Sequence, residues 1–255
     1  MEKKGQIFEL EVTIDDDLVE QTKRDNMKLC LVRSMRSKGS DYKIYPTIWV
    51  ALDDYDNKNV FVWSQDGYQV FTSNSQVKED TSIDIINSYP ITFGQSLVIK
   101  DESGQGEIEP GMTSFKSNIT IENNTSAIMT TGLLHTIKIN GEHRPAASIC
   151  AQTVEPQLST VIVPTHNVFV VLAPNASPGT TITQFLGDGI LVKTSCSNES
   201  PGADSDSFTR KIVFTQIKQA NDGIERTIWQ STFFSEQNFI TPIYKELNLF
   251  DYLTE

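Results

Sequence analysis

Three histidines are the side chains in this sequence best suited to transfer a proton or hold a metal ion: His135, His143 and His166. None lies in H-x-H or H-x-x-x-H spacing, which would place two imidazoles on one face of a strand or helix, and the chain has no G-x-S-x-G nucleophile elbow. His135 begins an alternating strand pattern, and the other two stand in turn-like contexts. The sequence therefore predicts surface or hydrogen-bonded histidines, no catalytic residue and no metal site.

Two acidic segments carry the hard oxygen ligands that Ca²⁺ prefers, Asp53–Asn57 and Asp204–Asp206. Both lack the glycine and the terminal glutamate of an EF-hand, so they are interpreted as solvated turns. The three cysteines, Cys30, Cys150 and Cys196, are odd in number and widely spaced, which argues against a disulfide framework or a zinc site. We expect Cys30 and Cys150 to be buried core residues, and we expect no cofactor.

Four aromatic residues could stack on sugar rings if their faces were exposed. They lie within or beside apolar strand-like segments, which favours burial in the core: Trp49, Tyr55, Trp63 and Tyr68.

The segment 113–136 is dense in Ser and Thr, and much of it alternates polar with apolar residues. Lipid-facing and lumen-facing residues alternate in this way in a transmembrane β-hairpin. The simpler interpretation, which we prefer, is a pair of ordinary strands with polar outer faces.

Composition restricts the partners. The 255 residues include 33 acidic and 21 basic side chains, a net charge of −12, which argues against nucleic acid and against anionic lipid as partners. The one basic cluster, Arg33, Arg36, Lys38 and Lys43, is short and is interpreted as a solvated strand end or loop. No apolar stretch approaches the roughly 20 residues of a membrane-spanning helix, and residues 1–10 lack the apolar core of a signal peptide. We expect a cytoplasmic protein without a stable membrane anchor, and release without a leader stays open.

Apolar residues recur with period two along most of the chain, as at Phe8–Ile14 and Ser114–Ile121. Turn signals, such as Asp66-Gly67 and Asn140-Gly141, separate these short segments, a pattern typical of β-sandwiches and barrels. Only the residues from Asp15 to Lys23 suggest a helix. The sequence therefore predicts an all-β protein.

Segments of the first half match segments of the second half in order. Phe8–Ile14 aligns with Phe115–Ile121, and Thr81–Ile83 aligns with Thr180–Ile182. We interpret this as a duplication giving two tandem antiparallel β-sandwich modules, at 6–105 and 113–225, joined by a Gly- and acid-rich linker.

The remaining residues, 226–255, form a third segment that is rich in aromatic side chains. They could be a strap over their own domain or an arm that docks on a neighbouring subunit, since aromatic rings of this size need burial. On the second interpretation the oligomer contacts would be Trp229, Phe233, Phe234, Phe239 and Tyr244.

Three segments resemble a group of largely uncharacterised fungal proteins: Tyr45–Leu52 with its W-V motif, the strand pair Val60–Ser73, and the F-G-Q turn within Ile91–Ser96. Val168–Ala173 followed by Thr180–Gln184 is similar to a later strand pair of that group. The resemblance implies a signal-less all-β protein with no established chemistry, and residues 228–255 depart from it.

Taken together, these patterns favour a non-enzymatic structural protein that self-associates as a homo-oligomer. Two alternatives stay open. One is a carbohydrate-binding defence lectin with a glycan as its partner, and the other is a β-pore-forming cytolysin that uses 113–136.

Overall fold

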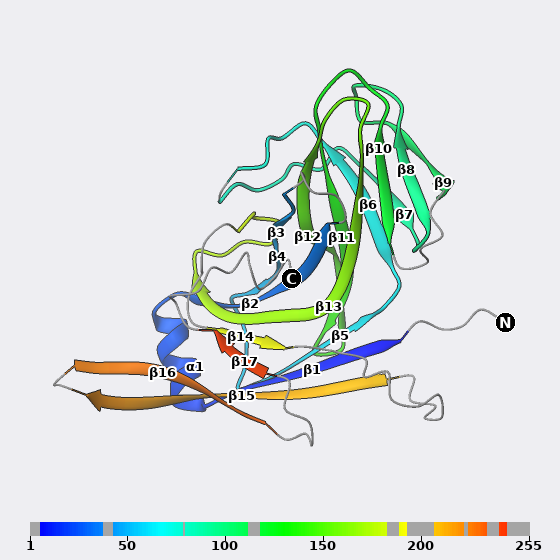
Figure 1. Ribbon diagram of the computed structural model, residues 1–255. Coiled ribbons are helices and arrows are strands. Elements are labelled where there is room, and N and C mark those ends of the chain that lie inside the picture. The colour runs from blue at the N-terminus through cyan, green and yellow to red at the C-terminus, as the bar shows by residue number, and fades with distance from the viewer. Residues whose placement is uncertain are drawn as a thin grey trace.

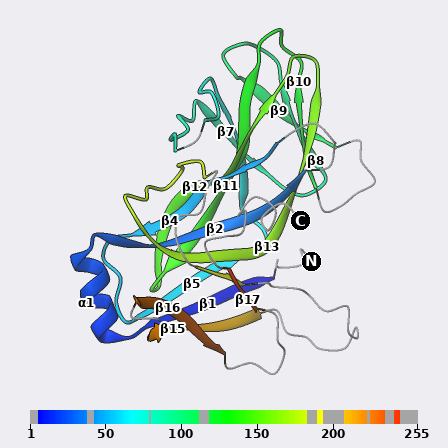
Figure 2. The same cartoon turned by 60° about the vertical axis from the view of Figure 1, so that its left-hand side comes forward.

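Two curled, mostly antiparallel β-sheets pack face to face in the computed structural model, and the one helix among the described residues is short and lies at one end (Figures 1 and 2). The structure describes residues 6–37, 43–78, 80–111, 118–182, 189–192, 207–221, 224–233 and 240–243. In the last three ranges only the backbone is described. The same is true of Ser34 and His166, whose side chains are not described. The predicted all-β architecture is confirmed.

The strands and the helix have the following bounds: β1 Ile7–Ile14, α1 Asp16–Arg24, β2 Met27–Ser37, β3 Tyr45–Pro46, β4 Ile48–Leu52, β5 Lys58–Ser64, β6 Tyr68–Ser73, β7 Asn87–Ile91, β8 Gln95–Ile99, β9 Gly106–Pro110, β10 Ile119–Asn123, β11 Met129–Ile139, β12 Glu142–Val154, β13 Ser159–Pro174, β14 Gly189–Val192, β15 Ser207–Asn221, β16 Ile224–Phe233 and β17 Ile240–Ile243.

The first sheet follows the order β16-β15-β1-β5-β11-β12-β3, with β6 and β7 joined to it through β11. The second follows β17-β14-β13-β10-β8-β9, with β2 and β4 joined to it through β13. The apolar positions of the alternating strands point inward from both sheets and form one main core that includes Phe8, Leu31, Leu97, Leu133 and Val170. Burial of this shared face is what holds the sheets together.

The expected tandem arrangement is not confirmed, because each sheet contains strands from both 6–105 and 113–225. β1 pairs with β15, β2 with β13, β6 with β11, and β8 with β10, so strands of one predicted module lie beside strands of the other.

The two halves nevertheless share one pattern of strand pairing, in which equivalent strands have equivalent partners. This repetition supports the duplication. β1 lies between an antiparallel β5 and a parallel β15, as β10 lies between an antiparallel β13 and a parallel β8. β2 lies between β4 and β13, as β11 lies between β12 and β6. The hairpins β8–β9 and β15–β16 match as well. We therefore describe two like halves that exchange strands.

Irregularities in the sheets repeat too. The β2–β4 ladder shifts register between Leu31 and Val32, and the β11–β12 ladder shifts between Leu133 and Leu134. Arg33 comes directly after Val32, the residue that follows the first shift, and His135 comes directly after Leu134, the residue that follows the second. The fold thus places Arg33 and His135 at equivalent positions of the two halves.

Candidate functional site

The residues singled out in the sequence are not gathered at one place in the described structure. His135 is fully buried in β11, whereas His143 is exposed at the start of β12. The side chain of His166, in β13, is not described. Asp204–Asp206 and Cys196 lie outside the described residues. No group of three or more His, Cys, Asp or Glu side chains that could hold a metal ion occurs among the residues that the structure describes.

The four aromatic residues considered for sugar binding belong to the core, as predicted. Trp49, Tyr55, Trp63 and Tyr68 are all at most 4% exposed, so none of them offers an open ring face. Within 113–136, residues 129–135 are all buried in β11, which pairs with β12 on one side and β6 on the other.

Two of the five predicted oligomer contacts, Trp229 and Phe233, lie in β16, where only the backbone is described. The other three, Phe234, Phe239 and Tyr244, lie outside the described residues, so the contacts stay a prediction.

Two cysteines are buried and free, as expected: Cys30 and Cys150. Burial raises the pKa of each thiol to about 12, because the interior disfavours the thiolate. Neither thiol is therefore activated as a nucleophile.

Arg33 is a side chain that the sequence interpretation placed wrongly. It is fully buried, not part of a solvated strand end, although its neighbour Arg36 is exposed. Residues 29, 31, 33 and 35 of β2 all face the main core, but Cys30 and Val32 are buried as well. The run 29–32 is therefore apolar at every position, and it gave no alternation that would have placed Arg33 inside. A charged residue on the inward face of a strand is unusual, since burying an unpaired charge is costly.

The guanidinium of Arg33 is held by three hydrogen bonds from three elements. Nη1 donates to Nδ1 of His135 at 3.0 Å, and Nη2 donates to the Tyr68 hydroxyl at 3.0 Å and to the Thr165 carbonyl at 2.7 Å. The group also lies over the rings of Trp49 and Tyr68, at 5.3 and 5.6 Å from their centroids. Cation–π attraction of this kind partly replaces the lost hydration of the charge.

This geometry fixes the protonation of His135. Arginine can only donate, so Nδ1 of His135 must accept, and the ring proton must therefore lie on Nε2. Nε2 is 3.0 Å from the carbonyl oxygen of Asp66, which can only accept, so the second bond agrees with the first. His135 is thus a neutral imidazole whose two nitrogens are both occupied, and it is stacked on Tyr68 with the ring centroids 4.4 Å apart.

No carboxylate forms a salt bridge with Arg33 among the described residues, and its Nε has no hydrogen-bond partner there. Both Arg33 and His135 are 0% exposed, so substrate has no access to either. The arrangement ties β2 to β6, β11 and β13, and so connects strands of both halves; it is not suited to proton transfer with a ligand.

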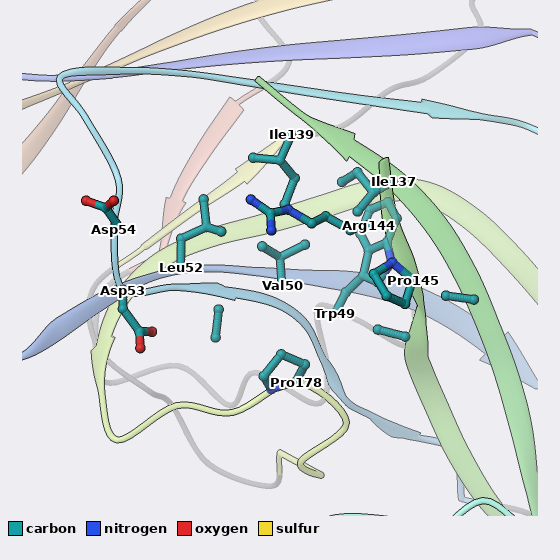
Figure 3. A pocket seen from close by; sticks show the side chains of 13 residues that line it. Trp49, Val50, Leu52, Asp53, Asp54, Ile137, Ile139, Arg144, Pro145 and Pro178 are labelled. Carbon is teal, nitrogen blue, oxygen red and sulfur yellow. The ribbon is translucent and has the colours of Figure 1, made fainter. Parts of the chain in front are cut away.

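A groove of about 480 Å³ lies beside this centre (Figure 3). Trp49 lies between the Arg33–His135 pair and the groove. Its indole N–H donates to the His135 carbonyl at 3.0 Å, and it is one of the groove's lining residues although it is only 1% exposed. The volume falls within the range of ligand-binding clefts.

Most of the groove is apolar, and its charged lining residues are Asp53 and Asp54 at the end of β4 and Arg144 on β12. Figure 3 shows Val50, Leu52 and Ile139 between the carboxylates of Asp53 and Asp54 on one side and Pro145 on the other. The lining residues are Trp49, Val50, Ala51, Leu52, Asp53, Asp54, Ile137, Ile139, Arg144, Pro145, Ala146, Ala147 and Pro178.

The charges at the groove each have a partner near the surface. Lys28 is 3.0 Å from Asp53, and Lys23 is 3.2 Å from Asp54, whose side chain is fully exposed. Arg144 is 3.4 Å from Glu142 across a half-exposed surface. Exposed pairs of this kind contribute little to stability and remain free to exchange partners.

Comparison with known proteins gives no relative: no family model, no curated protein and no solved structure matches the chain. The resemblance to fungal proteins therefore stays a prediction. Within the described ranges, no helix is long and apolar enough to cross a membrane.

Proposed function

We propose that this is a non-enzymatic structural protein that self-associates as a homo-oligomer through its strand edges. The proposal is supported by the backbone of the hairpin β15–β16.

β15 pairs with β1 only along 207–214, where Phe214 lies opposite the last residue of β1, Ile14. From Thr215 to Asn221, β15 pairs only with β16 among the described strands. Figure 1 shows this two-stranded ribbon running past the end of β1. A two-stranded ribbon is marginally stable alone in water, and its open edges can pair with another chain. A second copy is the partner that this argument favours.

Shortening the hairpin tests the proposal. Thr215 and Gln230 are cross-strand partners, so residues 216–229 can be replaced by Asn-Gly, a two-residue turn that suits a hairpin. We expect native mass measurement and light scattering at micromolar concentration to show an oligomer for the full chain and a smaller species for the shortened variant. Circular dichroism should be that of a folded β protein in both.

A matched control keeps the hairpin length and changes its charge, for which Lys218→Gln serves. We expect it to retain the mass of the unaltered chain. A full chain that is a strict monomer at these concentrations would contradict the proposal.

A further inference from the structure

The groove lies where an antiparallel ladder comes apart. Tyr45 pairs with Ala151 and Pro46 with Cys150, and the Thr47 N–H donates to the Ile149 carbonyl at 3.3 Å. In this register the next partners would be 49 with 147 and 52 with 144. Instead, β4 turns away to pair with β2, and residues 49–52 and 144–147 form opposite walls of the groove.

Both walls are therefore strand edges without a neighbouring strand. Among the described strands, β4 pairs only with β2, and residues 144–147 of β12 pair only with β11. The floor includes Ile137 and Ile139, alternate residues of β11 that point the same way. Alternate residues of a strand repeat at about 6.6 Å, so the floor suits an extended segment with apolar residues at every second position. Addition of such a strand to a free edge is a recurrent mode of peptide binding.

The charges around the groove suggest which segment fits. Residues 245–249 read Lys-Glu-Leu-Asn-Leu, with two charged residues followed by apolar residues at alternate positions. If this segment runs antiparallel to β4, Lys245 comes beside Asp53 and Asp54 at the end of β4, and Glu246 points to the opposite face, away from the floor. Leu247 and Leu249 then follow along the apolar floor. The position of Lys245 beside two carboxylates and the spacing of the leucines agree with the groove in this direction.

The same chain cannot supply this segment. Ile243, Gly189, Val171, Cys30 and Ala51 form one row across the five strands from β17 to β4. Four strand spacings of about 4.8 Å put Ala51 roughly 19 Å from Ile243 along the sheet. Two extended residues from Ile243 to Lys245 reach only about 7 Å. A strand in the groove must therefore come from a second molecule.

We infer that the groove between β4 and β12 is an acceptor site for the segment Lys245–Leu249 of a second copy, which adds to β4 as an antiparallel strand. The inference rests on the proposed self-association and specifies one of its contacts.

The test compares full-length variants by sedimentation equilibrium. Leu249→Asp places a charge on the apolar floor, and burial of a leucine is worth about 1.5–3 kcal/mol, so we expect dissociation to become at least roughly tenfold easier. The matched control is Leu253→Asp, which alters the same tail outside the inserted segment and should leave the dissociation constant unchanged.

A charge exchange tests the direction of the strand. Lys245→Glu and Asp54→Lys should each weaken association several-fold, and the double variant should recover it, because each single change brings like charges together. Asp54 is fully exposed, so its replacement should not disturb folding.

The outcomes separate the two claims. Association that is lost on shortening the β15–β16 hairpin but unchanged by Leu249→Asp would overturn this inference and leave the proposed function standing. A full-length chain that never associates would overturn both.

Discussion

The guanidinium of Arg33 shows why an unmatched charge can be tolerated in the core. Its Nη atoms reach a ring nitrogen, a hydroxyl and a carbonyl, and two aromatic faces lie beside it. A planar group with several fixed donors is needed for this, and a lysine ammonium on its flexible stem cannot reproduce it.

Replacing Arg33 by Lys should therefore destabilise the protein although the formal charge is kept. We expect the free energy of unfolding to fall by about 3 kcal/mol, the scale at which a broken buried charge network acts, measured by urea denaturation. Arg36→Lys is the control, since Arg36 is on the same strand but exposed; it should change the free energy by less than about 0.5 kcal/mol. Equal stability of the two variants would mean that the Arg33 contacts contribute little.

The buried thiols give a second prediction at this scale. Because burial raises the pKa of Cys30 and Cys150 to about 12, almost no thiolate exists at about pH 8, and the thiolate is the reacting form. Iodoacetamide should leave both residues unmodified in the native protein and modify both in concentrated urea, as read by peptide mass spectrometry. Rapid labelling of either residue in the native protein would contradict the described packing.

At the scale of single elements, β11 pairs with three strands of the first sheet, β5, β6 and β12, and its Gly132 has no room for a side chain. A Cβ at that position would lie 2.0 Å from the Cys150 carbonyl oxygen and 2.7 Å from the Phe71 ring. Since one of these atoms belongs to the backbone of β12, the strand pair itself would have to move apart.

Gly132→Ala should consequently lower the free energy of unfolding by about 3 kcal/mol, as expected when a close-packed site is overfilled. Thermal unfolding followed by circular dichroism measures the loss. Lys138→Ala, an exposed change on the same strand, is the matched control and should shift the free energy by less than about 0.5 kcal/mol. An unchanged melting temperature for Gly132→Ala would show that β11 and β12 are less closely packed.

Element identity was largely readable from the sequence because it depends on local periodicity. The alternation at Phe8–Ile14 gave β1, and the Asn140-Gly141 turn gave the β11–β12 hairpin, where both residues have positive φ. Arg33 could not be placed in this way, because residues 29–32 are apolar at every position and show no alternation that could be extended to residue 33.

Strand partners were not readable in the same way, because alternation states which face is buried and not which strand lies beside it. The similar number of residues between matching segments indicated two like halves. That number is the same whether the strands of each half pair among themselves or with strands of the other half. The groove was missed for that reason, since it depends on β4 leaving β12 after Thr47, a choice of partner made between distant segments.

For the molecule as a whole, exchange of strands means that neither half can bury its own core. β2 of the first half has its longest pairing with β13 of the second, and β6 of the first half lies against β11 of the second. A half made alone would expose both these edges and the apolar faces behind them.

Cutting the chain distinguishes exchanged halves from tandem modules. A protease site placed within 112–117, between β9 and β10, should be cleaved without separating the pieces. The products should co-elute in gel filtration and unfold in one cooperative transition, because the contacts across the cut are those of the sheets themselves. Residues 1–111 produced alone should show no cooperative unfolding. Two tandem modules would behave in the opposite way: the pieces would part after cleavage, and each would melt by itself at its own temperature.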